Sequence, residues 1–312
     1  MKPAIVIVGS LNMDFVVRTE HLPSAGETVL GKGFQMIPGG KGANQACAAG
    51  RLASGVLVRM IGRVGYDIFR DQLKASLAAA GVDVSAVSSV RSESTGVAMI
   101  SVDAHGQNSI IVAMGANAAF HASEIEGSRG SFREARYALF QLEIPLQTVD
   151  AALRLARREG ARTILDPAPA QHLPPDLLPA VDILTPNETE AAILLGRRPS
   201  RVSLADAPAL AAAVHALGPK AVVLKLGDQG CFYWDGETEI YSPPFAVQAR
   251  DATAAGDTFN AALAVALAED QRISQALRFA NAAAAISVTR HGAQSSAPTR
   301  QEVEQLLAGH SC

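Results

Sequence analysis

The chain has few cysteines and no closely spaced cysteine pair. Cys47, Cys231 and Cys312 are far apart in 312 residues, and no C-x-x-C motif occurs. Isolated cysteines in odd number argue against a disulfide framework and against a thiolate zinc site. The 7 histidines are scattered, and none shows the H-E-x-x-H spacing of a metal site. We therefore assign no function to cysteine or histidine.

The chain also lacks an excess of one charge and lacks long apolar runs. It has 27 Lys and Arg against 30 Asp and Glu, a formal net charge of -3. This balance does not favour nucleic acid or an anionic membrane as a partner. No apolar run approaches the roughly 20 residues that span a bilayer, and the short run at 4–8 is soon followed by Asn12 and Asp14, unlike a signal peptide. We expect a cytoplasmic protein.

Strand and helix patterns alternate along most of the chain. Residues 4–8 form a continuous apolar run, as in a strand buried on both faces of a parallel sheet. Further strands are expected at 56–61, 137–142, 163–166, 182–184 and 221–226, with helical periodicity between them. The alternation predicts an α/β fold with a doubly wound, mainly parallel sheet flanked by helices. Because no linker or repeat interrupts it, we expect one domain over 1–312.

Two stretches break the alternation, at about 14–38 and 95–113. Short strands are expected at 15–17, 27–30 and 34–36, and again at 95–102 and 109–113. We interpret them as a small β-sheet lid over the ligand site. Such a lid would exclude water and so limit wasteful hydrolysis of a phosphoryl donor.

The most informative stretch is 251–260. Apolar residues with helical spacing follow it, so Ala254, Ala255 and Gly256 are expected just before a helix start. Unpaired amides and the helix dipole attract anions there. A carboxylate at the same place, Asp257, is suited to accept the proton of a hydroxyl that receives a phosphoryl group. The alternative is that Asp257 only caps the helix.

Polar groups follow other expected elements. Asn12 and Asp14 come after the first strand, where open α/β sheets bind ligands and where vicinal hydroxyls could be held; an ordinary polar turn is the alternative. The glycine-rich turn at 39–45 places Lys41 and Asn44 within reach of a polar ligand. It is not a P-loop, because Lys41 is followed by Gly42, and it lacks the last glycine of the dinucleotide fingerprint.

Three further segments have open interpretations. Asn187 and Glu190 fit a capping box, but they are equally placed to face a hydrated magnesium ion and donor phosphates. The turn at 225–230 permits close approach of a nucleotide. Carbonyls and hydroxyls at 289–296 could line an ion site beside residues 251–260.

With these motifs in order, the chain resembles the PfkB-type (ribokinase-like) carbohydrate kinases over essentially its whole length. The motifs that carry the resemblance lie at 9–14, 39–45, 94–98, 108, 115–118, 141–143, 166–170, 185–190, 254–260 and 289–296. The resemblance implies ATP-dependent phosphorylation of D-ribose at its 5-hydroxyl. It also implies a homodimer formed through the lid strands.

The resemblance implies a role for each matching residue. The sugar would be held by Asn12, Asp14, Gly40, Lys41, Asn44, Glu143 and the general base Asp257. The anion hole would be formed by the amides of Ala254, Ala255 and Gly256. ATP and Mg²⁺ would lie along Asn187, Glu190, Lys225, Gly227, Gly256 and Asn281, with Glu190 reaching Mg²⁺ through water. Potassium would be bound by Asp251, Thr253, Ser287, Arg290, Gly292 and Ser296.

The sequence departs from the family pattern at three positions. Ala252 replaces a threonine, Lys225 stands where some members carry threonine, and Ala262 replaces a glycine. None removes a proposed catalytic group. The alternatives are another sugar or nucleoside kinase, such as a deoxyribokinase or fructokinase, or a non-catalytic sugar sensor. Aromatic residues at only 5% argue against a nucleoside, and Asp257 argues against a sensor.

Overall fold

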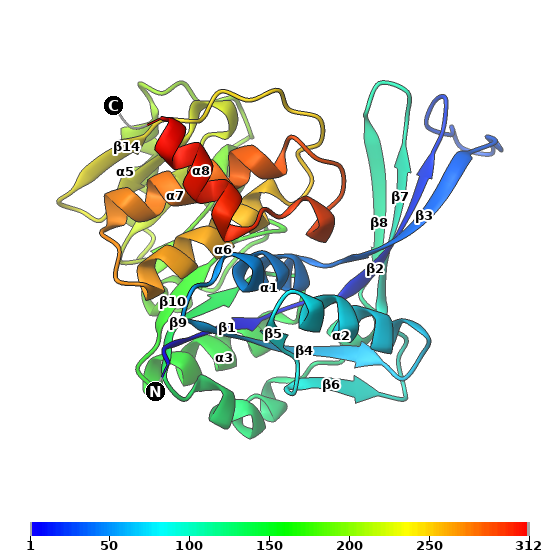
Figure 1. The fold of residues 1–312 in the computed structure, drawn as a ribbon, viewed down its shortest axis with the longest axis horizontal. Helices are drawn as coiled ribbons and strands as arrows, with labels where there is room; N and C mark the ends of the chain where they lie inside the picture. The colour runs from blue at the N-terminus through cyan, green and yellow to red at the C-terminus, as the bar shows by residue number, and fades with distance from the viewer. Residues whose placement is uncertain (1, 311–312) are drawn as a thin grey trace.

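The computed structural model describes residues 2–310, which are built around one large twisted sheet (Figure 1). Its strand order is β14-β13-β12-β11-β10-β9-β1-β4-β5, and β6 pairs with β4. The pairs from β5 to β12 are parallel, whereas β13 and β14 are antiparallel. The strands are β1 (Ala4–Val8), β4 (Leu57–Gly65), β5 (Val82–Asp83), β6 (Val87–Val90), β9 (Ala135–Phe140), β10 (Arg162–Leu165), β11 (Ile183–Leu184), β12 (Val222–Lys225), β13 (Cys231–Trp234) and β14 (Glu239–Ser242).

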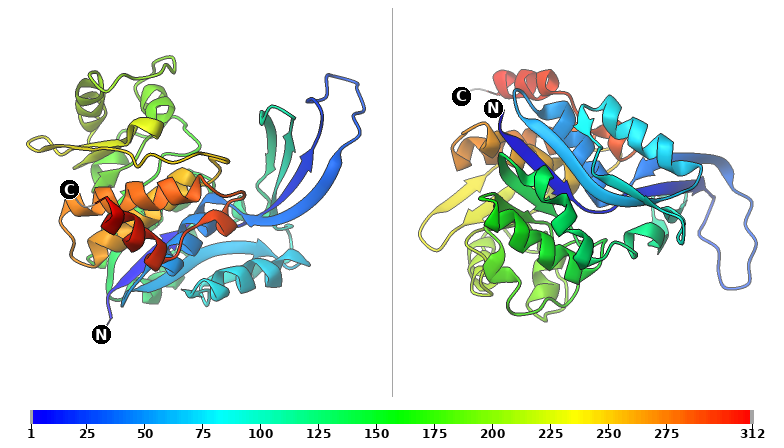
Figure 2. Two further views of the ribbon diagram at one scale, coloured as in Figure 1. Left: turned by 45° about the horizontal axis from the view of Figure 1, so that its top comes forward. Right: turned by 90° about the horizontal axis from the view of Figure 1, so that it is seen from below.

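Helices cover both faces of this sheet (Figures 1 and 2). One layer contains α1 (Lys41–Leu52), α2 (Phe69–Ala79), α6 (Ala255–Ala268), α7 (Ile273–Ser287) and α8 (Arg300–Gly309), and the other contains α3 (Leu146–Arg158), α4 (Glu188–Leu194) and α5 (Ala207–His215). Short 3₁₀ turns lie at Gly115–Asn117, Ala122–Glu124, Glu126–Phe132, Leu178–Ala180, Gly227–Gln229 and Gln294–Ser296.

The central strand β1 explains why there are two cores. Side chains alternate across a strand, so Ile5 and Ile7 enter the core beneath α1, α6 and α7, while Val6 and Val8 enter the core beneath α3. All five residues of β1 are fully buried. This confirms the predicted α/β fold with a mainly parallel sheet between helices.

A separate sheet of four strands, in the order β3-β2-β7-β8, projects from the body (Figure 1). It contains β2 (Asn12–Arg18), β3 (Lys32–Gly39), β7 (Gly96–Val102) and β8 (Asn108–Ala113). The two interrupting stretches therefore form one small sheet, because β2 and β7 pair in parallel. Strands are present at four of the five predicted positions, 15–17, 34–36, 95–102 and 109–113.

Some local predictions were wrong. No strand forms at 27–30; this segment belongs to the loop between β2 and β3, where Glu27 accepts a hydrogen bond from the Ser24 amide at 2.9 Å. The hairpin of β13 and β14 was not predicted, although its turn at Asp235 and Gly236 has a typical turn sequence. Helix α6 begins at Ala255, so Ala255 and Gly256 lie in its first turn rather than before it.

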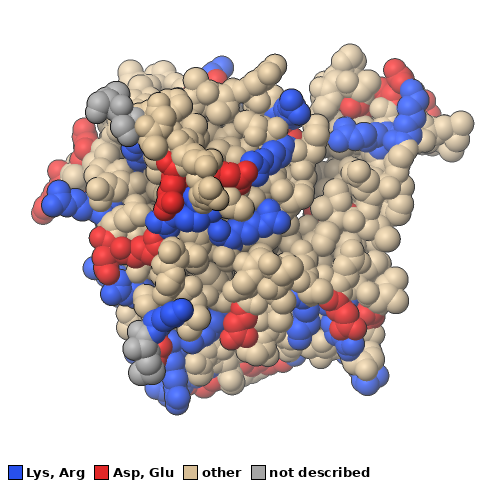
Figure 3. All heavy atoms as spheres, in the orientation of Figure 1, with Lys and Arg blue, Asp and Glu red and all other residues tan. Residues whose placement is uncertain are grey.

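Two surface features complete the description. Within residues 2–310, no helix combines the length and apolarity needed to cross a bilayer. On the face shown in Figure 3, basic and acidic side chains are interspersed over the body, and much of the projecting sheet is uncharged.

Candidate active site

The candidate site lies at the carboxyl edge of the large sheet, where the starts of α1 and α6 meet the base of the projecting sheet. Polar residues arrive there directly after β1, β9 and β10, as expected for an open α/β fold. Segments that are far apart in sequence contact one another at this edge. For example, Asn44 on α1 donates a hydrogen bond from Nδ2 to Asp257 Oδ2 at 3.1 Å.

Asp257 is a buried carboxylate in the first turn of α6. The helix is capped by Ala254, whose φ of 57° is left-handed, and the side chain of Asp257 does not cap it. Instead, Asp257 Oδ1 accepts a hydrogen bond from Gln45 Nε2 at 3.1 Å, and Oδ2 accepts the one from Asn44. The alternative that Asp257 is merely an N-cap is therefore wrong.

Burial raises the pKa of Asp257 to about 6, although the nearby Lys41 ammonium lowers it. Burial together with the charges of Glu143 and Asp257 raises the pKa of Asp14 to about 7. Asp257 therefore has a pKa near neutrality, as a general base needs. Its surroundings supply both the burial and the compensating hydrogen bonds.

Hydrogen bonds connect the segments after β1 and β9 to the start of α1. Glu143 Oε2 accepts hydrogen bonds from Ser10 Oγ at 2.6 Å and from the Lys41 amide at 3.0 Å. Asn12 is buried, and its Oδ1 accepts a hydrogen bond from Asn117 Nδ2 at 2.8 Å. These bonds hold the ends of β1 and the start of α1 together.

Gly40 connects β3 to α1 at a point where a side chain would not fit. Its φ is 89°, and a Cβ there would lie 2.8 Å from the Asn12 amide nitrogen. Glycine therefore lets the turn pass directly over the end of β1. This close approach brings the predicted residues Asn12, Asp14, Gly40, Lys41 and Asn44 into one site.

Two buried polar groups near Asp257, on Asn44 and Lys41, are suited to bind a hydroxyl. Asn44 Oδ1 is buried and has no hydrogen-bond partner among residues 2–310. The ammonium of Lys41 is largely buried, and its pKa is raised by the charges of Asp257, Asp166 and Glu143, which outweigh the effect of burial. A hydroxyl could therefore donate to Asn44 and accept from Lys41.

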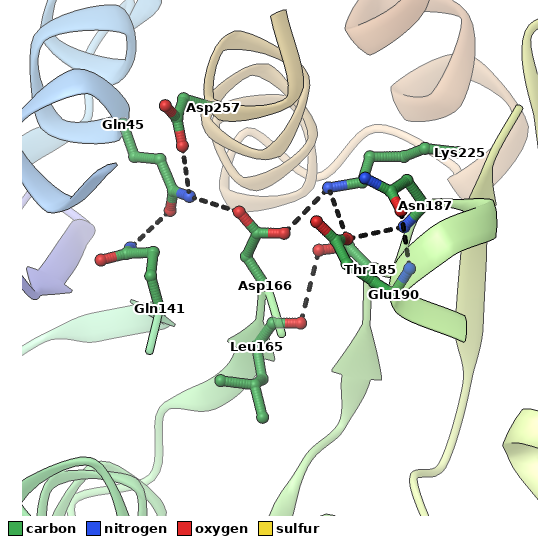
Figure 4. Close-up of polar contacts among 9 residues, drawn as sticks. All are labelled: Gln45, Gln141, Leu165, Asp166, Thr185, Asn187, Glu190, Lys225 and Asp257. Carbon is green, nitrogen blue, oxygen red and sulfur yellow. Dashed lines mark hydrogen bonds and ion pairs between the residues drawn. The ribbon is translucent and has the colours of Figure 1, made fainter. Parts of the chain in front are cut away.

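The other side of the site is organised around Lys225 at the end of β12 (Figure 4). Lys225 Nζ lies 2.8 Å from Asp166 Oδ1 and 3.9 Å from Glu190 Oε2. Asn187 and Glu190 form the predicted capping box of α4, with bonds of 2.8 and 2.7 Å. Burial raises the pKa of Glu190, against the influence of Lys225.

The start of α6 presents backbone amides to this side. Within residues 2–310, the amides of Gly256 and Asp257 donate to no backbone carbonyl outside their helix, whereas the Ala255 amide donates to Ala252 O at 3.2 Å. A Cβ at Gly256 would lie 3.4 Å from Lys225 Nζ, which places the ammonium next to this helix start. These amides and the ammonium form a candidate anion-binding corner, because both attract negative charge.

Of the residues predicted to bind potassium, Thr253 and Gly292 are joined by Asp251. Its Oδ1 accepts hydrogen bonds from the Thr253 amide at 2.9 Å and its Oδ2 from the Gly292 amide at 3.0 Å. Despite burial, these bonds lower the pKa of Asp251. The other two predicted hydroxyl ligands bond within their own segments: Ser287 Oγ donates to Ala284 O and Ser296 Oγ donates to Ala293 O, both at 2.8 Å.

The remaining residues predicted to bind the metal or the nucleotide include Arg290, Asn281 and Gly227. Arg290 is ion-paired with Glu302, so only its backbone is available to a cation. Asn281 Nδ2 donates to Ser242 and Pro243, which anchors the segment after β14. Gly227 begins a 3₁₀ turn after β12, with a φ of 57°. Residues 2–310 contain no cluster of three or more His, Cys, Asp or Glu side chains suited to a metal ion.

Sequence reasoning gave no role to four buried polar residues of the site. These are Gln45, Asn117, Gln141 and Asp166. Each lies in a motif that supports the family resemblance, at 39–45, 115–118, 141–143 and 166–170. Their position in these motifs is the only indication of a role that the sequence offers. Their hydrogen-bond partners are distant in sequence, so only the fold identifies those partners.

A buried carboxylate lies at the start of a helix, at the carboxyl edge of a parallel sheet, which suits phosphoryl transfer to an alcohol. The model of the "pfkB family carbohydrate kinase" matches residues 2–300. The chain belongs to the pfkB family of carbohydrate kinases.

Similar proteins cover nearly the whole chain. The ribokinase of Haemophilus influenzae is 42% identical over 311 residues, covering 98% of this chain and 99% of that protein. The ribokinase of Bacillus subtilis is 43% identical over 304 residues, covering 97% and 99%. The structure of Arabidopsis thaliana ribokinase complexed with ribose and ATP has a TM-score of 0.89 at 38% identity, covering 98% and 99%.

Proposed function

We propose that this protein transfers the γ-phosphoryl group of ATP to the 5-hydroxyl of D-ribose, with Asp257 as the general base. The observation that carries the proposal is the position of Asp257, buried in the first turn of α6 beside amides that have no backbone partner. The similar ribokinases, one of them complexed with ribose and ATP, support the choice of substrates.

The sugar hydroxyls are held by the groups gathered at the ends of β1 and β3. Asn12, Asp14, Lys41, Asn44 and Glu143 provide acceptors and donors, and the Gly40 turn allows the sugar to lie against the backbone. Asn44 Oδ1, which has no hydrogen-bond partner among residues 2–310, accepts a hydrogen bond from a sugar hydroxyl. Binding orients the 5-hydroxyl toward Asp257.

Asp257 takes the proton of the 5-hydroxyl as the hydroxyl oxygen attacks the γ-phosphorus of ATP. The bond from that phosphorus to the β,γ-bridging oxygen breaks, and ADP leaves. The amides of Ala254 and Gly256 stabilise the charge on the transferred group. The Ala255 amide joins them by exchanging its bond to Ala252 O for the phosphoryl oxygen. Amides fixed by a helix start cost little to reorganise during the reaction.

The donor lies along Asn187, Glu190, Lys225, Gly227 and Asn281. Mg²⁺ would neutralise phosphate charge, and Glu190 would bind it through water, since Glu190 Oε2 already accepts from the Asn187 amide. Potassium would be held by Asp251, the carbonyls of Thr253, Ser287, Arg290 and Gly292, and Ser296. It would order the loop that leads into the anion hole rather than contact the sugar.

We also propose one kinase domain over 1–312, with the lid strands as insertions, and a homodimer formed through those strands. The projecting sheet carries apolar side chains that are exposed in one subunit: Phe34 58%, Met36 49%, Met99 53%, Ile110 51%, Ile111 70% and Val112 46%. The strand register places Phe34, Met36, Met99 and Ile111 on the same face of the sheet. A second copy of the sheet would cover that face, since patches of this kind mark interaction sites.

Turnover of ATP against a panel of sugars tests the proposal. Ribose, deoxyribose, fructose, adenosine and uridine are compared with Mg²⁺ present. The proposed function predicts the highest kcat/KM with ribose and release of ribose 5-phosphate. Faster turnover of deoxyribose or fructose would assign the chain to another kinase of the family, and ribose binding without turnover would make it a sensor.

A further inference from the structure

A chain of buried polar side chains connects Asp257 to the donor side of the site (Figure 4). Gln45 Nε2 donates to Asp257 Oδ1 and to Asp166 Oδ2, both at 3.1 Å. Asp166 Oδ1 in turn accepts from Lys225 Nζ at 2.8 Å. Gln45 is completely buried and Asp166 is 2% exposed, so water does not weaken these bonds.

The orientation of the Gln45 amide is fixed by Gln141. Gln141 Nε2 donates to Gln45 Oε1 at 2.6 Å, which leaves the Gln45 amide nitrogen to face the two carboxylates. Gly9 makes room for this arrangement, because a Cβ there would lie 2.0 Å from Gln141 Oε1. Each of the two N–H groups of Gln45 therefore has its own carboxylate partner.

Asp166 and Lys225 are held equally firmly by their backbones. The Asp166 amide donates to Phe140 O at 2.9 Å, and the Lys225 amide donates to Pro186 O at 2.9 Å. Their ion pair is desolvated, with side chains 3% and 12% exposed. The Lys225 ammonium is thereby held beside Gly256 and the anion-binding corner.

We propose that Gln45 and Asp166 are positioning residues for phosphoryl transfer: Gln45 holds the Asp257 carboxylate, and Asp166 holds the Lys225 ammonium against the transferred group. This inference rests on the proposed function, in which Asp257 is the base. One amide thereby links the position of the base to that of a donor-side cation. Neither residue needs to contact a substrate.

The charges around Asp257 predict a different change in its pKa for the loss of Gln45 than for the loss of the Asp166 charge. They come from Lys41 on α1, Asp166 after β10 and Asp14 on β2, with Lys225, Glu143 and Glu190 beyond them. The hydrogen bond from Gln45 lowers the pKa of Asp257, whereas the charge of Asp166 raises it. Loss of Gln45 and loss of the Asp166 charge should therefore move this pKa in opposite directions.

The test compares Gln45→Met, Asp166→Asn and the double variant with Thr163→Val as control. Met fills the volume of Gln without its N–H groups, and Asn is nearly isosteric with Asp. Thr163 is a buried residue of β10 whose hydroxyl bonds to Ala180 O and Asp182 rather than to the Gln45–Asp166 network. For each variant, kcat is measured against pH, KM is measured for ATP, and ribose affinity is measured by calorimetry.

We expect Gln45→Met to lower kcat by about tenfold or more, as for loss of a hydrogen bond to a charged group, and to move the acid limb of kcat to higher pH. Asp166→Asn should move that limb to lower pH and raise the KM for ATP, because Lys225 loses its anchor. The double variant should return the limb toward that of the unmodified enzyme, and ribose affinity should change little throughout.

The positioning role would be overturned if the acid limb of kcat kept its pH in both single variants, or if it moved in the same direction in both. If one variant does not fold, the sign of the shift in the other still decides. Asp257→Asn, measured in parallel, separates the two claims. If Asp257→Asn keeps its turnover, both the proposed base and this inference are contradicted. If Asp257→Asn loses turnover but the acid limb of kcat does not move in Gln45→Met or Asp166→Asn, only the positioning role is contradicted.

Discussion

The carboxylate of Asp14 occupies the space next to Gly39 in which a side chain would otherwise stand. A Cβ at residue 39 would lie 2.1 Å from Asp14 Oδ2 and 2.5 Å from its Cγ. The absence of a side chain at residue 39 on β3 therefore leaves room for the Asp14 carboxylate on β2, which we propose binds the sugar. The projecting sheet would thereby help to position a sugar-binding group.

Gly39→Ala should displace the Asp14 carboxylate and weaken ribose binding by about tenfold or more, because misplacement of about 1 Å is costly in an oriented site. Calorimetry with ribose measures the effect. Gly127→Ala is the matched control, since a Cβ there meets nothing within 4 Å. Equal ribose affinity in the two variants would show that Asp14 does not need this space.

Asp14→Asn should stabilise the protein at pH 8 while it weakens sugar binding. The pKa of Asp14 is raised from 3.8 to about 7 in the folded state, so its ionisation costs stability that the chain loses as the pH rises between these values. The cost is fully present at pH 8, on the order of 1 to 4 kcal/mol. Asn cannot ionise and carries no such cost.

Urea unfolding at pH 5 and pH 8 measures this difference. The gain from Asp14→Asn should be larger at pH 8 than at pH 5. Asp176→Asn is the control, because its side chain is 76% exposed. A gain that is independent of pH would contradict the raised pKa of Asp14.

The sequence predicted the parts of this site that depend on local pattern. Asn12 and Asp14 follow a recognisable strand, and Asp257 lies at a recognisable helix start. The alternating elements indicated the sheet at whose edge these segments meet. It did not indicate the Gln45–Asp166 bond, which joins positions 121 residues apart. It also left open whether Asp257 caps α6, because that depends on the left-handed backbone of Ala254.

Asp251→Ala should abolish activation by potassium. Asp251 connects Thr253 to Gly292 through its two carboxylate oxygens, so its loss separates the two segments of the proposed cation site. Turnover is measured against KCl at constant ionic strength, and the rise in Tm on adding KCl gives an independent readout. Unchanged responses to KCl in both measurements would place the cation elsewhere.

Ile111→Glu should convert the proposed homodimer into monomers. Ile111 lies on β8 and is 70% exposed in one subunit, and burial of a charge in an apolar interface is unfavourable. Analytical ultracentrifugation determines the mass. Leu57→Glu, at an exposed residue at the start of β4, is the control. A dimer that persists in Ile111→Glu would exclude the centre of β8 from the interface.

The most direct test of the account is Asp257→Asn, with turnover of ribose and ATP measured alongside ribose binding. Asn keeps the size of Asp and can still pair with one of its two amide partners, but it cannot accept the hydroxyl proton. We expect kcat to fall by about 10² to 10⁴, while calorimetry still detects ribose binding. Turnover near that of the unmodified enzyme would contradict the assignment of Asp257 as the base.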